Sequence, residues 1–182
     1  MNQVVLGLGS NKSYKNLSPV QILSKACCEL EKFISSLRVS SVYKTGAMYV
    51  TSQEDFYNMV VTGFYNESCE KLLEQIHSVE ALYGRNREEE YRNGPRSLDI
   101  DIELFGQLSV KSEDLVIPHE RMLERAFVLK PLLDISSENA DVESNKEFYE
   151  NKLKLLADQK IDLFMDSFEF EKMRHKDGYS SN

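Results

Sequence analysis

One stretch of alternating residues constrains this chain most: the run from Ser97 to Leu104, in which every second residue is apolar. Alternation with a period of two is typical of a β-strand with one buried and one polar face. The apolar set, which would enter a core, is Leu98, Ile100, Ile102 and Leu104. The polar set, on the opposite face, is Ser97, Asp99, Asp101 and Glu103. Gly94-Pro95 before the run and Gly106 after it predict the limits of this strand.

The two aspartates of this strand are the first candidates for chemistry. Asp99 and Asp101 share one face, so their backbones lie roughly 7 Å apart and their side chains can converge on a cation. Mg²⁺ binds through one or two carboxylates and leaves its other positions to water and phosphates. Arg96, at the head of the strand, would then contact a phosphate. On the Asp-x-Asp triplet alone, the alternative is favoured: a solvated strand face on which an arginine pairs with one aspartate.

Length and composition limit the classes of protein that fit. A chain of 182 residues is expected to form one domain with a sizeable core. Its 22 basic and 30 acidic residues give a net charge of −8, whereas a general nucleic-acid binder would be basic. Its three cysteines form neither a zinc pattern nor a disulfide framework, which favours a reducing compartment. No apolar run reaches membrane-spanning length. We expect a cytoplasmic monomer that binds neither nucleic acid nor membrane.

The order of the expected elements predicts a fold class. Strands are expected over residues 4–11, 39–43, 56–64 and 97–104. One helix is expected to start at Ser18 and to continue through apolar positions to Leu37, and a second to run from Ser68 to Gly84. The βαββαβ order is typical of a ferredoxin-like α+β fold, an antiparallel sheet with helices packed on it.

The rest of the chain is expected to be mostly helical. Apolar residues between 122 and 132 predict a helix that closes over the core, and the segment 136–173 predicts one or two further docked helices. Residues 174–182 are expected to form a disordered tail. The predicted organisation is a single domain over residues 1–173, with a core at 4–135 and a helical extension at 136–173.

Other polar residues are ambiguous when each is taken alone. Asn58 is flanked on its strand face by large apolar groups, so it either satisfies a backbone group or makes a polar contact at the bottom of a pocket. Arginines cluster at both ends of the polar segment 85–93, where they would either pair with its acidic residues or bring positive charge to a polyphosphate. These arginines are Arg85, Arg87, Arg92 and Arg96. In isolation, His119 and Arg125 are better explained as surface residues.

Together, these residues fall into motifs that follow one another in a fixed order. The motifs are Leu8-Gly9-Ser10-Asn11, Phe56-Tyr57-Asn58, Gly84-Arg85, Gly94-Pro95-Arg96-Ser97-Leu98-Asp99-Ile100-Asp101, Pro118-His119 and Arg125-Ala126-Phe127. Over residues 4–135 they resemble the 6-hydroxymethyl-7,8-dihydropterin pyrophosphokinase family of folate biosynthesis. The combination of Gly-Pro-Arg-x-x-Asp-x-Asp with a later Pro-His and Arg-x-Phe is highly specific.

The resemblance implies an activity and a set of site residues. The enzyme would transfer the terminal pyrophosphoryl group of ATP to the hydroxymethyl oxygen of the reduced pterin, leaving AMP. Asp99 and Asp101 would hold two Mg²⁺ ions, and Arg85 and Arg96 would act with them as catalytic residues by neutralising the transferred phosphates. Glu80 would orient an arginine. The implied pterin-binding residues are Thr45, Phe56, Asn58 and Phe127. The implied ATP-binding residues are Arg87, Ile102, His119 and Arg125.

Elementary chemistry agrees with this activity, because phosphoryl-type transfer needs positioning and charge neutralisation more than a strong base. Two other functions stay open. The Asp pair would also suit another Mg-dependent nucleotidyl or phosphoryl transferase, which product analysis separates because pyrophosphoryl transfer yields AMP rather than ADP. The other is a non-catalytic ferredoxin-like module that binds a cation or nucleotide.

Overall fold

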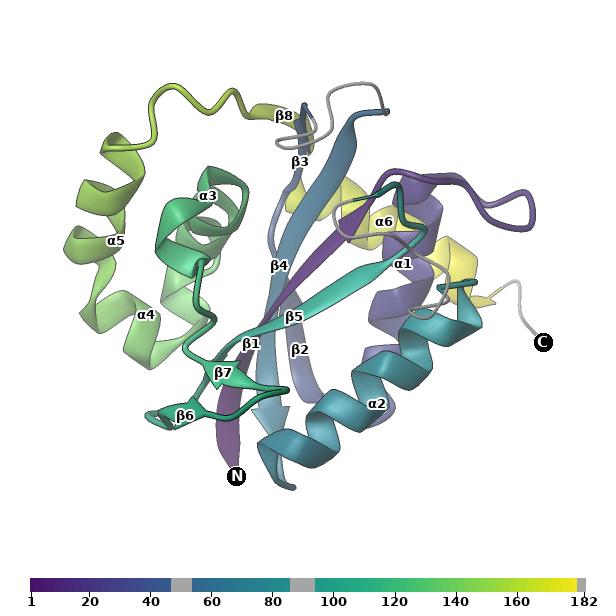
Figure 1. Ribbon diagram of the computed structural model, residues 1–182. Helices are drawn as coiled ribbons and strands as arrows, with labels where there is room; N and C mark the ends of the chain where they lie inside the picture. Colours follow the sequence, from purple (N-terminus) through teal and green to yellow (C-terminus); the bar gives the residue numbers. More distant parts are fainter. Residues whose placement is uncertain (47–53, 86–93, 180–182) are drawn as a thin grey trace.

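The protein is built around one antiparallel sheet with helices on both faces (Figure 1). The computed structural model describes residues 1–46, 54–85 and 94–179. The strands of the main sheet are β1 (Asn2–Ser10), β2 (Ser35–Val39), β3 (Val42–Thr45), β4 (Phe56–Tyr65), β5 (Asp99–Phe105) and β8 (Asp162–Met165). A separate hairpin pairs β6 (Val110–Lys111) with β7 (Val116–Ile117). The α-helices are α1 (Pro19–Leu30), α2 (Cys69–Leu82), α3 (Ala126–Asp134), α4 (Ala140–Ser144), α5 (Lys146–Lys154) and α6 (Ser167–Tyr179). Two short 3₁₀ turns are η1 (Met122–Glu124) and η2 (Ser136–Glu138).

The strand order confirms the predicted fold class. The sheet runs β5-β1-β4-β3-β8, with β2 also paired to β4, and every pairing is antiparallel. The first half of the chain therefore forms an α+β unit of the ferredoxin-like kind, to which further C-terminal helices are added.

Each face of the sheet has its own apolar core, because side chains along a strand alternate between the faces. On one face, Leu6 and Met59 join Ile22 of α1 and Ile76 of α2 in the larger cluster. On the other face, Val5 and Val60 pack against α3, α4 and α5. Figure 1 shows α1, α2 and α6 on one side of the sheet and α3, α4 and α5 on the other. The result is a three-layer arrangement.

The first helix starts where the sequence predicts but ends earlier. Ser18 caps α1, accepting a hydrogen bond from the backbone of Gln21, whose side chain bonds back to Ser18. The prediction that the helix continues to Leu37 is wrong, since α1 ends at Leu30 and Leu37 lies in β2. Apolar residues after Leu30 kept the helical spacing by coincidence, while Ser36 adopts a positive φ of 53° that interrupts a helix. The strand predicted over 39–43 is likewise divided between β2 and β3.

The alternating strand forms as β5, with one irregularity that changes its C-terminal end. In the pairing with β1, Leu6 lies opposite Ile102 and Val5 lies opposite Leu104, so Glu103 is the extra residue of a β-bulge. Beyond a bulge the faces exchange. Leu104 therefore packs against the α3 side of the sheet, and Phe105 enters the larger core. The prediction that Leu104 shares a face with Leu98 is wrong for this reason.

The C-terminal extension contains a strand as well as helices, which corrects the all-helical prediction for residues 136–173. β8 pairs with β3 and forms the last strand on that side of the sheet. Short apolar runs do not distinguish strand from helix by periodicity, and the free edge of β3 decides the outcome. Helix α6 continues beyond the predicted boundary at residue 173, to Tyr179, and the buried Arg174 forms ion pairs with Glu31 and Glu171. Within the described residues, no helix combines the length and apolar character needed to cross a membrane.

Candidate functional site

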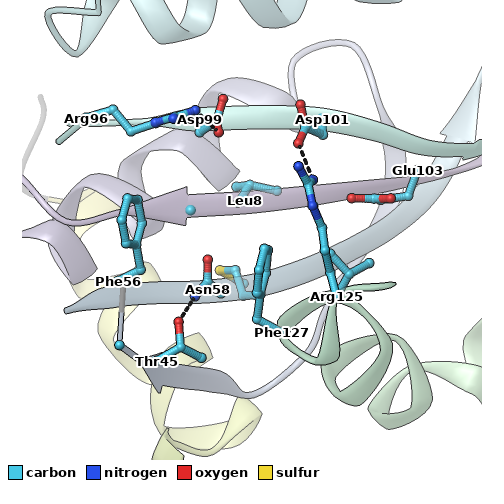
Figure 2. A pocket seen from close by; sticks show the side chains of 15 residues that line it. Leu8, Thr45, Phe56, Asn58, Arg96, Asp99, Asp101, Glu103, Arg125 and Phe127 are labelled. Atoms are coloured by element: carbon cyan, nitrogen blue, oxygen red, sulfur yellow. Dashed lines mark hydrogen bonds and ion pairs between the residues drawn. The ribbon is translucent and has the colours of Figure 1, made fainter. Parts of the chain in front are cut away.

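The first cavity opens on the α3 face of the sheet, at the end of the strands that α3 leaves uncovered (Figure 2). There β1 contributes Gly7 and Gly9, which leave room above the sheet. A side chain at Gly9 would meet the amide oxygen of Asn58 at 3.0 Å, and one at Gly7 would meet a carboxylate oxygen of Glu103 at 2.8 Å. The glycines therefore make space for polar groups that come from the neighbouring strands.

All four residues predicted to bind the pterin line this cavity: Thr45, Phe56, Asn58 and Phe127. Phe56 and Asn58 are two residues apart in β4 and share a face, while Phe127 comes from the first turn of α3. The amide nitrogen of Asn58 donates a hydrogen bond to Thr45 Oγ1 at 2.9 Å. Figure 2 shows the rings of Phe56 and Phe127 on either side of Asn58. Asn58 therefore lies in a pocket, with polar and aromatic groups around it.

Asp99 and Asp101 also line this cavity, from the same face of β5. Arg96 Nη1 donates to Asp99 Oδ2 at 2.5 Å, and Arg85 Nη1 bonds the other carboxylate oxygen of Asp99. Arg125 Nη1 donates to Asp101 Oδ2 at 3.1 Å. Arginines thus bond both aspartates: Arg85 and Arg96, which belong to the cluster expected from the sequence, bond Asp99, whereas Arg125, which the sequence alone suggested to be a surface residue, bonds Asp101.

Arg85 lies behind Asp99 rather than on the cavity wall. Its side chain is largely buried and also bonds Glu80 at 2.5 Å and the backbone carbonyl of Leu98 at 3.2 Å. Glu80 itself is buried and accepts the backbone N–H of Ile100 at 2.8 Å. The prediction that Glu80 orients an arginine is confirmed: it fixes Arg85, and Arg85 in turn fixes Asp99.

A second cavity lies on the other side of β5, between α2 and the β6–β7 hairpin. Two residues predicted to bind ATP, Ile102 and His119, line it, together with Leu73 and His77 of α2. Arg125, predicted to bind ATP as well, lines the first cavity instead. Asp101 belongs to the walls of both cavities. The two cavities therefore adjoin at Asp101.

His119 is placed close to Asp101 by the backbone. The backbone N–H of His119 donates to the backbone carbonyl of Glu103 at 3.0 Å, and the ring atom Nε2 lies 3.8 Å from Asp101 Oδ2. Burial lowers the pKa of His119, an effect that the charge of Asp101 opposes. Its Nδ1 accepts the backbone N–H of Arg121 at 3.1 Å, which leaves Nε2 as the nitrogen that carries the proton.

The electrostatics of Asp101 suit a cation. Burial raises the pKa of Asp101, and the nearby charge of Asp99 raises it further. Two carboxylates close together on one strand are hard oxygen donors, the kind that Mg²⁺ prefers. Among the described residues, no group of three or more His, Cys, Asp or Glu side chains could hold a metal ion. The donor set fits a cation that takes one or two carboxylates and completes its shell with water and phosphate oxygens.

Sequence reasoning missed two residues of this site. Asn11, the last residue of the Leu8-Gly9-Ser10-Asn11 motif, accepts the backbone N–H of Arg96 through Oδ1 at 2.8 Å and donates through Nδ2 to the carbonyl of Glu54 at 3.0 Å. Glu103 is buried and lines the first cavity. Its position two residues beyond Asp101 was the available signal. Arg87 and Arg92, also singled out from the sequence, lie outside the described residues.

Comparison with known proteins identifies the family. The family model described as 7,8-dihydro-6-hydroxymethylpterin-pyrophosphokinase (HPPK) matches residues 5–137. The 2-amino-4-hydroxy-6-hydroxymethyldihydropteridine pyrophosphokinase of Helicobacter pylori is 35% identical over 133 residues, which are 72% of this chain and 79% of that protein. The "Folic acid synthesis protein fol1" of Pneumocystis carinii is 38% identical over 135 residues, 74% of this chain but only 18% of that longer protein.

A solved structure supports the fold. The Plasmodium falciparum HPPK-DHPS wild type with pteroate superposes with a TM-score of 0.58 at 17% identity, covering 84% of this chain and 44% of that one. At this identity the likeness supports the fold alone. The chain spans 18–29% of the length of five folate-synthesis relatives that it matches. The extent of the family match, over most of the chain, shows that it belongs to the 7,8-dihydro-6-hydroxymethylpterin-pyrophosphokinase family.

Proposed function

We propose that this chain transfers the pyrophosphoryl group of ATP to the hydroxymethyl group of 6-hydroxymethyl-7,8-dihydropterin, giving AMP and the pterin diphosphate, as a step of folate biosynthesis. The single observation that carries the proposal is that Asp101 lines both cavities. A transfer between two substrates requires that their reacting ends meet, and the residue shared by the two cavities marks the place where they would.

In this proposal the pterin occupies the first cavity. A flat heteroaromatic ring suits a slot between Phe56 and Phe127, because aromatic side chains stack on its faces. Asn58 and Thr45 would recognise the polar edge of the ring, since an amide offers both a donor and an acceptor. The hydroxymethyl group would then point toward Asp99 and Asp101.

The nucleotide would occupy the second cavity. Ile102 supplies an apolar surface for the adenine ring, and His119 Nε2 supplies a donor for a phosphate oxygen. Arg125, on the far side of Asp101, would contact the transferred phosphates. Arg87 is proposed to bind ATP from the segment outside the described residues.

Asp99 and Asp101 would hold two Mg²⁺ ions, which would neutralise phosphate charge and lower the cost of deprotonating the hydroxymethyl group. The arginines that now bond these carboxylates would turn to the phosphates: Arg96, on the cavity wall, is in position to do so. Arg85 is held by Glu80, so we propose that its main part is to fix Asp99, while its positive charge stabilises the negative charge that develops on the phosphate oxygens during transfer.

We also propose that the chain acts as a cytoplasmic monomer and forms a single domain. The net charge of −8 supports the absence of a nucleic-acid partner, because phosphate backbones bind basic surfaces. The buried contacts of α6 with α1 support a single domain that includes the C-terminal extension.

The test is incubation of the purified chain with ATP, Mg²⁺ and the reduced hydroxymethylpterin, with separation of nucleotides by chromatography. We expect AMP to appear in proportion to the pterin consumed, and no AMP when the pterin is omitted. Formation of ADP would indicate a simple phosphoryl transferase. If no nucleotide is turned over, the result would favour a module that binds its ligands without catalysing a reaction.

A further inference from the structure

We propose that Glu103 is a positioning residue that receives the guanidinium group of Arg125 when a divalent cation takes the Asp101 oxygen that Arg125 holds in this structure. The inference rests on the proposed function, because it takes Asp101 to be a cation ligand. It assigns a role to a carboxyl group that neither the fold nor the proposed reaction otherwise explains.

The carboxyl group of Glu103 has an unusual environment for a polar group. The residue is 1% exposed and lines the first cavity. Neither of its oxygens has a hydrogen-bond partner among the residues that the structure describes. Burying a polar group without a partner costs free energy, and buried side-chain oxygens in proteins are nearly always bonded. An apolar side chain at this position would stabilise the fold better, so the carboxyl group calls for another explanation.

The donor that matches Glu103 lies beside it. Arg125 uses Nη1 to bond Asp101 Oδ2 at 3.1 Å, while its Nε is buried and has no hydrogen-bond partner among the described residues. Figure 2 shows the carboxyl group of Glu103 directed toward the side of Arg125 that carries Nε. An unsatisfied donor and an unsatisfied acceptor thus belong to the lining of one cavity, without forming an ion pair in this structure.

The other nearby group cannot satisfy Glu103. His119 Nδ1 lies 3.9 Å from Glu103 Oε2, beyond hydrogen-bond distance. The same nitrogen already accepts the backbone N–H of Arg121, so it has no proton to give. Gly7, under the carboxyl group, leaves it space, since a Cβ there would lie 2.8 Å from Glu103 Oε1. Among the unsatisfied buried side-chain donors of the described residues, Arg125 Nε is therefore the one whose residue lines the same cavity as Glu103.

Cation binding would create the need for this contact. A cation at Asp101 competes with Arg125 for Oδ2, and the side chain of Arg125 is only 16% exposed. A released guanidinium would otherwise stay buried without an acceptor for its N–H groups, which is costly. Glu103 accepts an N–H in either protonation state through a carbonyl oxygen. It would hold Arg125 away from Asp101 and aim its remaining N–H groups at the phosphates.

The test compares two variants of the full chain. Glu103→Met keeps the length of the side chain and removes both acceptors, whereas Glu103→Gln keeps one acceptor oxygen. Calorimetric titration with Mg²⁺, in the presence of a non-hydrolysable ATP analogue, should show an apparent affinity about 10-fold weaker in Glu103→Met and within about threefold of wild type in Glu103→Gln. The melting temperature of Glu103→Met should equal or exceed that of wild type, because the unpaired carboxyl group is gone.

A third variant separates positioning from direct metal binding. In an Arg125→Gln background there is no guanidinium to hold, so adding Glu103→Met should leave the Mg²⁺ affinity unchanged. A persisting 10-fold effect in that background would mean that Glu103 acts on the cation itself, and would overturn the proposal. So would wild-type Mg²⁺ affinity in Glu103→Met, or a lower melting temperature for that variant. If the wild-type protein binds no Mg²⁺ in the presence of the analogue, the proposed function itself is contradicted, and this inference falls with it.

Discussion

Asp99 and Asp101 project from the same face of β5 into one cavity, yet each is bonded by different arginines. Asp99 is held by Arg85 and Arg96, and Asp101 by Arg125. The two carboxylates therefore form a pair in space without being interchangeable. Only Asp101 also borders the second cavity.

Removing either carboxylate should stop the reaction. We expect Asp99→Asn and Asp101→Asn to lower turnover by roughly 10²-fold or more, because a lost cation contact costs several kcal/mol of transition-state stabilisation. Pterin binding should weaken less, since the ring contacts are elsewhere. Steady-state kinetics at saturating Mg²⁺ give both values, with the exposed Asp158→Asn as matched control. Wild-type rates in either variant would remove the cation assignment.

The two arginines on Asp99 should separate by their effect on stability. Both Arg85→Ala and Arg96→Ala should reduce kcat about 10²-fold, if each acts on developing charge. Arg85→Ala should in addition lower the free energy of unfolding by roughly 3 kcal/mol, because it leaves the buried Glu80 without its partner. Urea unfolding measures this difference, and Arg121→Ala, at an exposed ion pair, provides the control. Equal stability of Arg85→Ala and Arg121→Ala would contradict the buried pairing.

Removing one ring of the aromatic slot should weaken the binding of the pterin without weakening that of ATP. Phe127→Ala should raise the KM for the pterin about 10-fold, since stacking of a ring on an aromatic side chain contributes about 1–3 kcal/mol. The KM for ATP should change little, because Phe127 lines the first cavity and not the second. Phe148→Ala, at an exposed phenylalanine, is the comparison. A larger effect on ATP than on pterin would reverse the assignment of the cavities.

Much of this site could be predicted from the sequence, because it depends on local pattern. The alternation around Asp99 and Asp101 predicts their common face, and the cap at Ser18 predicts the start of α1. Contacts between distant segments were beyond such reasoning. The bulge at Glu103 arises from pairing with β1, and the pairing of Arg125 with Asp101 joins residues 24 positions apart. β8 was missed for a similar reason, since its strand conformation depends on the edge of β3.

The C-terminal extension should behave as part of the domain. Phe170 is fully buried in the larger core, while Phe168, two residues earlier, is 67% exposed. Phe170→Ala should therefore lower the free energy of unfolding by about 3–4 kcal/mol, and Phe168→Ala by less than about 0.5 kcal/mol. Thermal and urea unfolding test the pair. Similar stability of the two variants would mean that α6 is not integral to the fold.

Alkaline pH should destabilise the protein through Tyr83, at the end of α2. Burial, with a smaller effect from the charge of Glu29, raises the pKa of Tyr83 to about 12. A raised pKa in the folded state gives stability that is complete below the unfolded pKa of about 10 and is lost as pH rises toward 12. Tyr83→Phe should remove about 2 kcal/mol of the decline in unfolding free energy between pH 10 and 12. Identical slopes for wild type and Tyr83→Phe would refute this.

The most direct measurement is anomalous diffraction from crystals grown with Mn²⁺ in place of Mg²⁺, a non-hydrolysable ATP analogue and the hydroxymethylpterin. We expect anomalous peaks within bonding distance of both Asp99 and Asp101, with the pterin between Phe56 and Phe127 and the nucleotide beside His119. A cation bound away from these two carboxylates, or both ligands in one cavity, would contradict the central claim that the substrates meet at Asp101.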